Sequence, residues 1–376
     1  MAWEIIMGKP TNDELYMSRA IELAQRGAGW TSPNPLVGAV IVKDGHVIGE
    51  GWHHKYGDLH AERDALKNCT EDPAGATIYV TLEPCCHHGK QPPCTEALIE
   101  AGIRRVVMGS GDPNPLVAGE GIRILRDHGI TVDEGVLEPE CRGINDIFFH
   151  FITTGRPYVA MKYAMTMDGK IACFTGASKW VTGEKAREHV QTLRNRYRGI
   201  MVGIGTVLAD DPMLNCRIPG GRSPVRIICD SHLRTPMDSQ IVRTAGEYET
   251  IIAACVEDPE RYASYEKQGV TVLHVPEAGA AGQRVDLGQL LRVLGERKID
   301  SILLEGGAQL NWSMAAGGYV NKVYTYIAPK IFGGAAAKSP VGGDGFPDPK
   351  DALHMKVIRT VSLGDDLLVE STIFDS

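Results

Sequence analysis

The chain has 376 residues, of which 43% are hydrophobic and 23% are charged, and its formal net charge is −8. This balance is typical of a soluble globular protein with enough residues for two domains of ordinary size. An acidic chain without a run of Lys or Arg disfavours binding to nucleic acid through neutralisation of phosphates.

Strands and helices alternate in the first 150 residues. Apolar residues at helical spacing predict a helix over residues 12–25, with Thr11 or Asn12 as its cap. Asp44-Gly45, between two apolar stretches, predicts a β-hairpin over residues 37–51. Helices are expected next at 60–69, 95–102 and 121–130, and strands at 76–84, 104–115 (with a turn) and 130–136. This alternation favours an α/β layer sandwich.

A joint is expected near residues 145–157, where a short helix is followed by Gly155 and Pro157. The alternation then restarts with a helix at 184–197 and strands at 158–165, 199–205, 225–230, 250–255, 270–275, 301–307 and 322–328. Because the second stretch has enough elements for a core of its own, the sequence predicts two α/β domains, residues 1–152 and 153–376.

The nine cysteines are scattered along the chain, and the N-terminal segment lacks the basic start and long apolar stretch of a secretory signal. We therefore expect a reducing cytoplasmic location, with cysteines that serve as core residues or metal ligands and form no disulfides. The longest apolar runs are of strand length, so no membrane segment is expected.

Three residues could hold a catalytic zinc, namely His60, Cys85 and Cys94. Such a site commonly takes three protein ligands and keeps a fourth position for water. Glu62 lies two residues after His60 at the expected start of a helix, so its carboxylate could take a proton from that water.

Two other interpretations of these residues remain. A structural zinc site would need a fourth ligand, which could be Cys86, His87 or His88. The cysteines could also be unrelated to a surface histidine. The spacing H-x-E…P-C-x-x-C of nucleobase deaminases is not met, because eight residues separate Cys85 from Cys94. Glu62 favours the catalytic interpretation, because a structural site with four protein ligands needs no carboxylate for proton transfer.

Segments 33–45, 51–62, 81–94 and 111–122 resemble the deaminase half of the bifunctional deaminase–reductase family of riboflavin biosynthesis. That family has a long loop between the cysteines, of the form PCxHxGxxPPC, which residues 84–94 match. The resemblance implies a cytidine-deaminase-like three-layer sandwich with one Zn²⁺ per chain. It also implies a pocket for the pyrimidine and ribose phosphate lined by Asn34, His53, His87, Lys90, Asp112 and Asn114.

Simpler roles exist for some of these lining residues. Asn34 and Asn114 each precede a proline and could serve only as turn residues. Lys90 could be a solvated loop residue.

The second half is harder to interpret from its residues alone. Residues 202–212 contain Gly203-x-Gly205 but lack the full G-x-G-x-x-G dinucleotide motif. In residues 301–314, a buried strand ends at Glu305-Gly306-Gly307 and leads into a helix, whose N-terminal N–H groups would suit a phosphate. The glycines could instead merely allow close packing.

Segments 161–172, 178–187, 193–196, 202–217, 229–231 and 303–310 resemble the reductase half of the same family. The resemblance implies a dihydrofolate-reductase-like domain that uses NADPH and releases NADP⁺. The residues implied to contact the cofactor are Ala164, Trp180, Thr206, Asp210, Ser231 and Gly307. Those implied to contact the substrate are Ser178, Arg194, Leu214, Arg217 and Glu305.

The chemistry suggests finer roles for this second set. Arg194 and Arg217 offer fork-shaped donors for a ribose 5-phosphate, unless they lie on a solvated helix face. Proton movement during hydride transfer to the sugar could use Lys162, Asp210 or Glu305, although Lys162 could be a surface charge. Asn215 replaces a threonine that is frequent in the family motif.

The leading interpretation is a bifunctional enzyme with two sites that act in sequence. The first would deaminate 2,5-diamino-6-(ribosylamino)-4(3H)-pyrimidinone 5′-phosphate, and the second would reduce the ribosyl chain. The family implies a small-molecule pyrimidine ribotide as partner and a homo-oligomer, dimer or tetramer.

A polynucleotide-editing deaminase would need stacking aromatics, yet these make up 6% of the chain. The alternative without catalysis is a nucleotide-sensing domain that zinc stabilises, and such a domain would show no turnover.

Overall fold

The computed structural model describes residues 11–88, 91–114, 117–277 and 284–373. The chain divides into two compact units, residues 1–154 and 155–376. Each unit has its own sheet and its own hydrophobic core.

The first unit contains a five-stranded sheet in the order β2-β1-β3-β4-β5. β1 is antiparallel to β2 and β3, whereas β3, β4 and β5 are parallel. Asp44 and Gly45 both have positive φ angles, 48° and 82°, as the tight turn of a hairpin requires, and the predicted hairpin is confirmed. The strands are β1 (Gly38–Lys43), β2 (His46–Trp52), β3 (Thr77–Leu82), β4 (Arg105–Ser110) and β5 (Thr131–Asp133).

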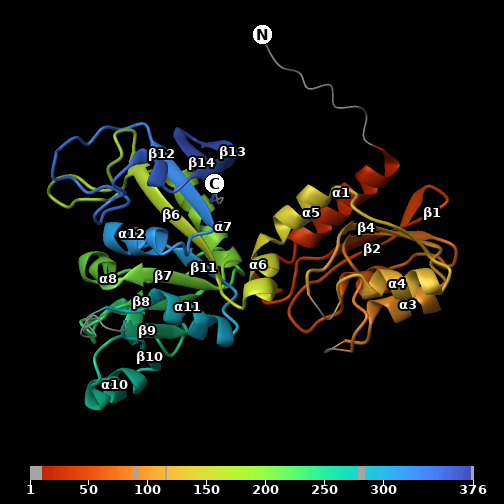
Figure 1. Cartoon of the computed structure of the whole chain (residues 1–376), viewed down its shortest axis with the longest axis horizontal. Coiled ribbons are helices and arrows are strands. Elements are labelled where there is room, and N and C mark those ends of the chain that lie inside the picture. The colour runs from red at the N-terminus through yellow and green to blue at the C-terminus, as the bar shows by residue number, and fades with distance from the viewer. Residues whose placement is uncertain (1–10, 89–90, 115–116, 278–283, 374–376) are drawn as a thin grey trace, which may run out of the picture. The chain divides into compact units, whose positions relative to one another are not determined.

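Helices cover both faces of this sheet, which gives three layers (Figure 1). α1 (Asn12–Gln25) and α5 (Glu138–Ile144) lie on one face. α2 (Ala61–Lys67), α3 (Cys94–Glu100) and α4 (Glu120–Asp127) lie on the other. α1 begins with a capping box between Thr11 and Glu14, which confirms Thr11 as its cap. α6 (Asp146–Thr154) ends the unit.

The second unit contains a nine-stranded sheet in the order β10-β9-β8-β7-β11-β6-β12-β14-β13. The seven strands from β10 to β12 in this order are parallel, and all seven were predicted from the sequence. The antiparallel pair β13 (Met355–Leu363) and β14 (Asp366–Ile373) was not predicted. The parallel strands are β6 (Tyr158–Thr166), β7 (Gly199–Gly203), β8 (Val225–Cys229), β9 (Thr250–Ala254), β10 (Val270–His274), β11 (Ser301–Leu304) and β12 (Lys322–Ala328).

Helices also cover both faces of the second sheet. α11 (Leu287–Glu296) and α12 (Ala308–Ala316) pack on one face. α8 (Ile204–Asp210), α9 (Gln240–Arg243) and α10 (Pro259–Glu266) pack on the other. The remaining helices are α7 (Glu184–Arg196) and a short 3-10 turn, Pro349–Asp351.

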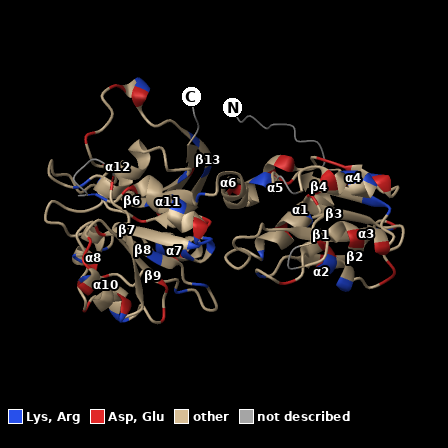
Figure 2. Ribbon diagram, turned by 60° about the horizontal axis from the view of Figure 1, so that its bottom comes forward, with Lys and Arg blue, Asp and Glu red and all other residues tan. Residues whose placement is uncertain are grey.

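Acidic and basic residues are interspersed along the helices of both units (Figure 2). On α4, for example, Arg123 pairs with Glu120 and Asp127. Among the described residues, every helix is too short or too polar to cross a bilayer.

Candidate active sites

The three predicted metal ligands come together in the first unit. His60 is the N-cap of α2, Cys85 follows β3, and Cys94 is the first residue of α3. The Nδ1 atom of His60 lies 3.4 Å from the Sγ atom of Cys85 and 3.4 Å from that of Cys94. Tetrahedral zinc with ordinary bond lengths would place such N and S atoms about 3.6 Å apart. The three side chains therefore fit a zinc ion.

The surroundings of Cys85 lower the pKa of its thiol, which favours metal binding. A hydrogen bond with Cys94, opposed by burial and helped by His60, lowers the pKa of Cys85 to about 4. The backbone N–H of Cys94 also donates to the Cys85 sulfur, at 3.4 Å. The pKa of Cys94 is raised well above its ordinary value by its hydrogen bond to Cys85 and by burial. The lowered pKa of Cys85 favours the thiolate, which is the form that binds zinc.

Glu62 lies in the first turn of α2 and is only 3% exposed. Burial, assisted by the negative charge of Cys85, raises the pKa of its carboxyl to about 7. Among the residues that the structure describes, the metal-binding group consists of His60, Cys85 and Cys94, without a fourth member. A carboxyl that is outside the ligand set and titrates near neutral pH suits proton transfer, as a catalytic site requires.

Two of the predicted lining residues bond to each other. His53 is 2% exposed, and its Nδ1 atom lies 2.9 Å from the Leu59 carbonyl oxygen, so Nδ1 carries the proton. The Nε2 atom then accepts from the side-chain amide of Asn34, at 3.2 Å. Burial lowers the pKa of His53, which keeps the ring neutral and fixes the direction in which Asn34 points.

Asp112 and Asn114 lie in the loop after β4. The backbone N–H of Asn114 donates to Asp112 Oδ1 at 2.8 Å, and burial raises the pKa of Asp112 to about 6. His87 is exposed in the loop after β3, and Lys90 lies outside the described residues. Glu83, a residue with no role predicted from the sequence, has a buried carboxylate that accepts a hydrogen bond from the loop that carries Asp112.

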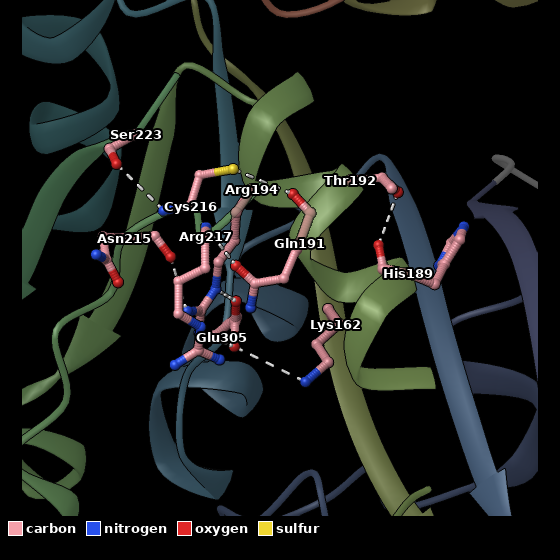
Figure 3. Close-up of polar contacts among 10 residues, drawn as sticks. All are labelled: Lys162, His189, Gln191, Thr192, Arg194, Asn215, Cys216, Arg217, Ser223 and Glu305. Carbon is pink, nitrogen blue, oxygen red and sulfur yellow. Dashed lines mark hydrogen bonds and ion pairs between the residues drawn. The ribbon is translucent and has the colours of Figure 1, made fainter. Parts of the chain in front are cut away.

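The second unit has a charged centre formed by Lys162, Arg194 and Glu305 (Figure 3). Arg194 on α7 binds Glu305 through two nitrogens, with Nε–Oε1 at 2.8 Å and Nη2–Oε2 at 3.1 Å. Lys162 Nζ on β6 lies 3.8 Å from Glu305 Oε2. Burial alone would raise the pKa of Glu305, but the two cations outweigh it and lower the value to about 2. Burial lowers the pKa of Lys162, so this lysine releases its proton more readily than an exposed one.

Arg194 is held in place by other residues of the unit. Its guanidinium binds Glu305 through Nε and Nη2, and Nη1 donates to the Asn215 carbonyl at 3.1 Å. Arg217 is exposed, and its guanidinium has no recorded partner among the described residues. Its backbone N–H is held by Gln191 Oε1 at 3.0 Å (Figure 3). The Leu214 side chain is 3% exposed in the core, so only its backbone could face a ligand.

Two helix N-termini lie beside each other at the carboxyl ends of adjacent strands. α8 begins after β7 with Gly203 as its N-cap, and α12 begins after β11 with Gly307, neither with a side-chain cap. A Cβ atom on Gly307 would meet nothing closer than Thr206 Oγ1, at 4.0 Å. This open cradle at two positive helix ends fits the phosphates of a dinucleotide. Ser231 follows the neighbouring strand β8, and Ala164 lies on β6 beside β11.

Of the other predicted residues of this unit, Trp180 and Asp210 are exposed and Ser178 is half-buried. Trp180 is 62% exposed, with the Arg187 guanidinium 4.7 Å from its ring centroid, and Ser178 lies in the same loop. Asp210 is exposed at the end of α8. In the described part of the chain, no contact joins Asp210 to Lys162 or Glu305, so only two of the three proton-transfer candidates lie together.

Comparisons with known proteins match both units. Residues 10–110 match the cytidine and deoxycytidylate deaminase zinc-binding region, and residues 157–369 match the RibD C-terminal domain. The riboflavin biosynthesis protein RibD of Actinobacillus pleuropneumoniae is 55% identical over 362 residues, which cover 96% of each chain.

Solved structures agree over the same length. Acinetobacter baumannii RibD, form 1, is 37% identical with a TM-score of 0.86, covering 97% of this chain and 99% of that one. A diaminohydroxyphosphoribosylaminopyrimidine deaminase/5-amino-6-(5-phosphoribosylamino)uracil reductase from Thermotoga maritima is 40% identical with a TM-score of 0.84, covering 96% and 99%. The predicted α/β fold class of both halves is confirmed.

Proposed function

Because the chain belongs to the RibD family of bifunctional riboflavin biosynthesis proteins, we propose that its two sites act in sequence on one pyrimidine ribotide. The chain is a zinc-dependent deaminase and an NADPH-dependent reductase. The first site hydrolyses the amine of 2,5-diamino-6-(ribosylamino)-4(3H)-pyrimidinone 5′-phosphate and releases ammonia. The second reduces the ribosyl chain to give 5-amino-6-(ribitylamino)uracil 5′-phosphate.

We assign the deaminase to residues 1–152 and the reductase to residues 153–376. The division of the chain after Thr154 and the two matched ranges, 10–110 and 157–369, support this assignment. The observation that carries the deaminase proposal is the ligand triad with a buried carboxyl beside it.

Glu62 is the catalytic acid–base in this proposal. Zinc held by His60, Cys85 and Cys94 supplies a Lewis acid that makes water a nucleophile at neutral pH. Glu62 takes a proton from the water and passes it to the ring nitrogen as the C–O bond forms. It then takes the proton of the added hydroxyl group and delivers it to the amine, which leaves as ammonia when the C–N bond breaks and the carbonyl forms. The pyrimidine and its ribose phosphate are bound by the lining set, Asn34, His53, His87, Lys90, Asp112 and Asn114.

Lys162 and Glu305 move the proton in the reductase proposal, supported by their contact and burial. NADPH would supply the hydride to C1′ of the ring-opened sugar in its imine form. Lys162, held in place by Glu305, donates the balancing proton to the imine nitrogen, which becomes the amine of the product. Arg217, with its available guanidinium, holds the 5′-phosphate. Ser178, Arg194, Glu305 and the backbone of Leu214 complete the substrate side. Two hydrogen bonds hold Arg194 and Glu305 together there. The cofactor is bound by Ala164, Trp180, Thr206, Asp210, Ser231 and Gly307.

We also propose that the chain forms a homo-oligomer through β13. This edge strand pairs only with β14 in the described part of the chain, and it exposes Met355, Val357 and Ile358 by 46%, 57% and 49%. An exposed apolar edge favours pairing with another copy. Replacing both Val357 and Ile358 by Lys should lower the mass measured by sedimentation to that of one chain. An unchanged mass would place the interface elsewhere.

We propose a cytoplasmic location, which the zinc site supports because Cys85 and Cys94 bind metal only as reduced thiolates.

Removal of zinc separates the two activities. A chelator should abolish ammonia release, yet NADPH oxidation with the deaminated ribosylamino compound should persist, because all three ligands lie within residues 1–154. Zinc added back should restore ammonia release. Equal loss of both activities on chelation would contradict the assignment of the metal to the deaminase alone.

A further inference from the structure

The Glu83 carboxylate, which follows β3, is 4% exposed and accepts three backbone N–H groups. Its Oε2 atom accepts from Asp112 at 3.3 Å and from Gly119 at 3.1 Å, and Oε1 accepts from Gly121 at 3.1 Å. The donors lie 29, 36 and 38 residues away in the sequence, in the loop after β4 and at the start of α4. One side chain therefore joins two segments of the chain to the end of β3.

A carboxylate suits this position, because both of its oxygens can accept hydrogen bonds from the three N–H groups. Hydrogen bonds to a charged acceptor are stronger, and the N-terminus of a helix favours negative charge. Gly119, the N-cap of α4, has a φ of 78° and offers no side chain to cap the helix, so Glu83 supplies the acceptor from a distance. A Cβ atom on Gly121 would lie 2.3 Å from the Pro84 carbonyl oxygen, so the start of α4 packs directly on the peptide before Cys85.

This arrangement places the loop with Asp112 and Asn114 relative to the metal ligand Cys85. We propose that Glu83 is a positioning residue of the deaminase site, which sets the affinity for the pyrimidine ribotide by holding that loop, without touching the substrate. The inference rests on the proposed substrate contacts of Asp112 and Asn114.

Glu83→Gln in the full, zinc-loaded chain tests this inference. The amide keeps the shape of the side chain but turns an NH₂ group toward backbone donors. We expect the KM for deamination to rise about tenfold while kcat changes by less than about twofold, the pattern of lost uniform binding. Zinc content and the reductase constants should stay unchanged. Glu120→Gln is the matched control, because it removes an exposed carboxylate from the first residue of α4, where Glu120 bonds Arg123, and it should leave KM unchanged.

Asn114→Ala separates failure of this inference from failure of the proposed function. If Asn114→Ala leaves KM unchanged, the loop does not contact substrate and the premise fails with the inference. If Asn114→Ala raises KM but Glu83→Gln does not, the positioning role alone is overturned. Loss of zinc and kcat in Glu83→Gln would also overturn it, because Glu83 would then support the metal site. Should reductase activity fall too, marking a folding defect, Glu83→Asp, with the charge kept but its reach shortened, should show the same rise in KM.

Discussion

Glu62→Gln is expected to lower the rate of ammonia release by roughly a thousandfold, within the range known for loss of a general acid–base. Glutamine has nearly the same shape as glutamate, but its amide cannot take a proton from water or deliver one to the leaving group. Because Glu62 is not one of the three metal ligands, the variant should still hold one zinc per chain. The measurement is ammonia released by purified, zinc-loaded protein at saturating substrate.

NADPH oxidation with the deaminated compound provides an internal standard for this variant, since we assign the reductase site to the other unit. Glu96→Gln is the matched control, because Glu96 is an exposed carboxylate on α3, two residues after a metal ligand. It should release ammonia at the wild-type rate. Full activity of Glu62→Gln would contradict the proposed role, and lost activity accompanied by lost zinc would assign Glu62 to the metal site.

Glu305→Gln is expected to remove reductase activity and to destabilise the second unit by about 3–5 kcal/mol. The Glu305 carboxylate compensates two cations that are almost buried, Arg194 and Lys162, with side chains 13% and 15% exposed. Without it, both charges stay in a poorly solvated site, and Lys162 loses the group that holds it. The measurements are denaturant unfolding of the full chain and NADPH oxidation.

The contribution of Glu305 to stability should also appear in the pH dependence of unfolding of the wild-type protein. The pKa of Glu305 in the folded chain is about 2, below its ordinary value of 4.5, so the ionised form stabilises the folded state. This contribution is complete above about pH 4.5 and is lost as the pH falls toward 2. The free energy of unfolding should therefore fall less steeply over this range in Glu305→Gln than in the wild type.

Glu249→Gln is the control for stability, because it breaks an exposed ion pair with Arg198 at 3.7 Å and should leave unfolding nearly unchanged. Wild-type stability of Glu305→Gln would mean that Arg194 and Lys162 do not depend on this carboxylate.

The three zinc ligands could be predicted because each of them lies in a short segment whose residue types and spacing are typical of a metal site. His60 and Glu62 are two residues apart, and each cysteine borders a strand or helix whose ends the hydrophobic pattern predicts. The hairpin at Asp44-Gly45 was predictable for a similar reason, since its turn requires residues that tolerate positive φ. Where local residues determine local geometry, the sequence is sufficient.

Contacts between distant segments could not be predicted in this way. The pairing of Arg194 with Glu305 spans 111 residues and depends on the order of the strands in the sheet, so nothing in the sequence indicated it. The contacts of Glu83 left no signal in the sequence, because its partners are backbone N–H groups, which nearly every residue carries. β13 was missed because its register shifts between Val357 and Arg359 and breaks the alternation expected of a strand.

The most direct test of the account follows ammonia and NADPH in one sample of unmodified protein supplied with the diamino ribotide. We predict ammonia release without NADPH, and NADPH oxidation only after ammonia has appeared. NADPH oxidation without ammonia would reverse the proposed order, and the absence of both signals from protein shown to contain zinc would contradict the account.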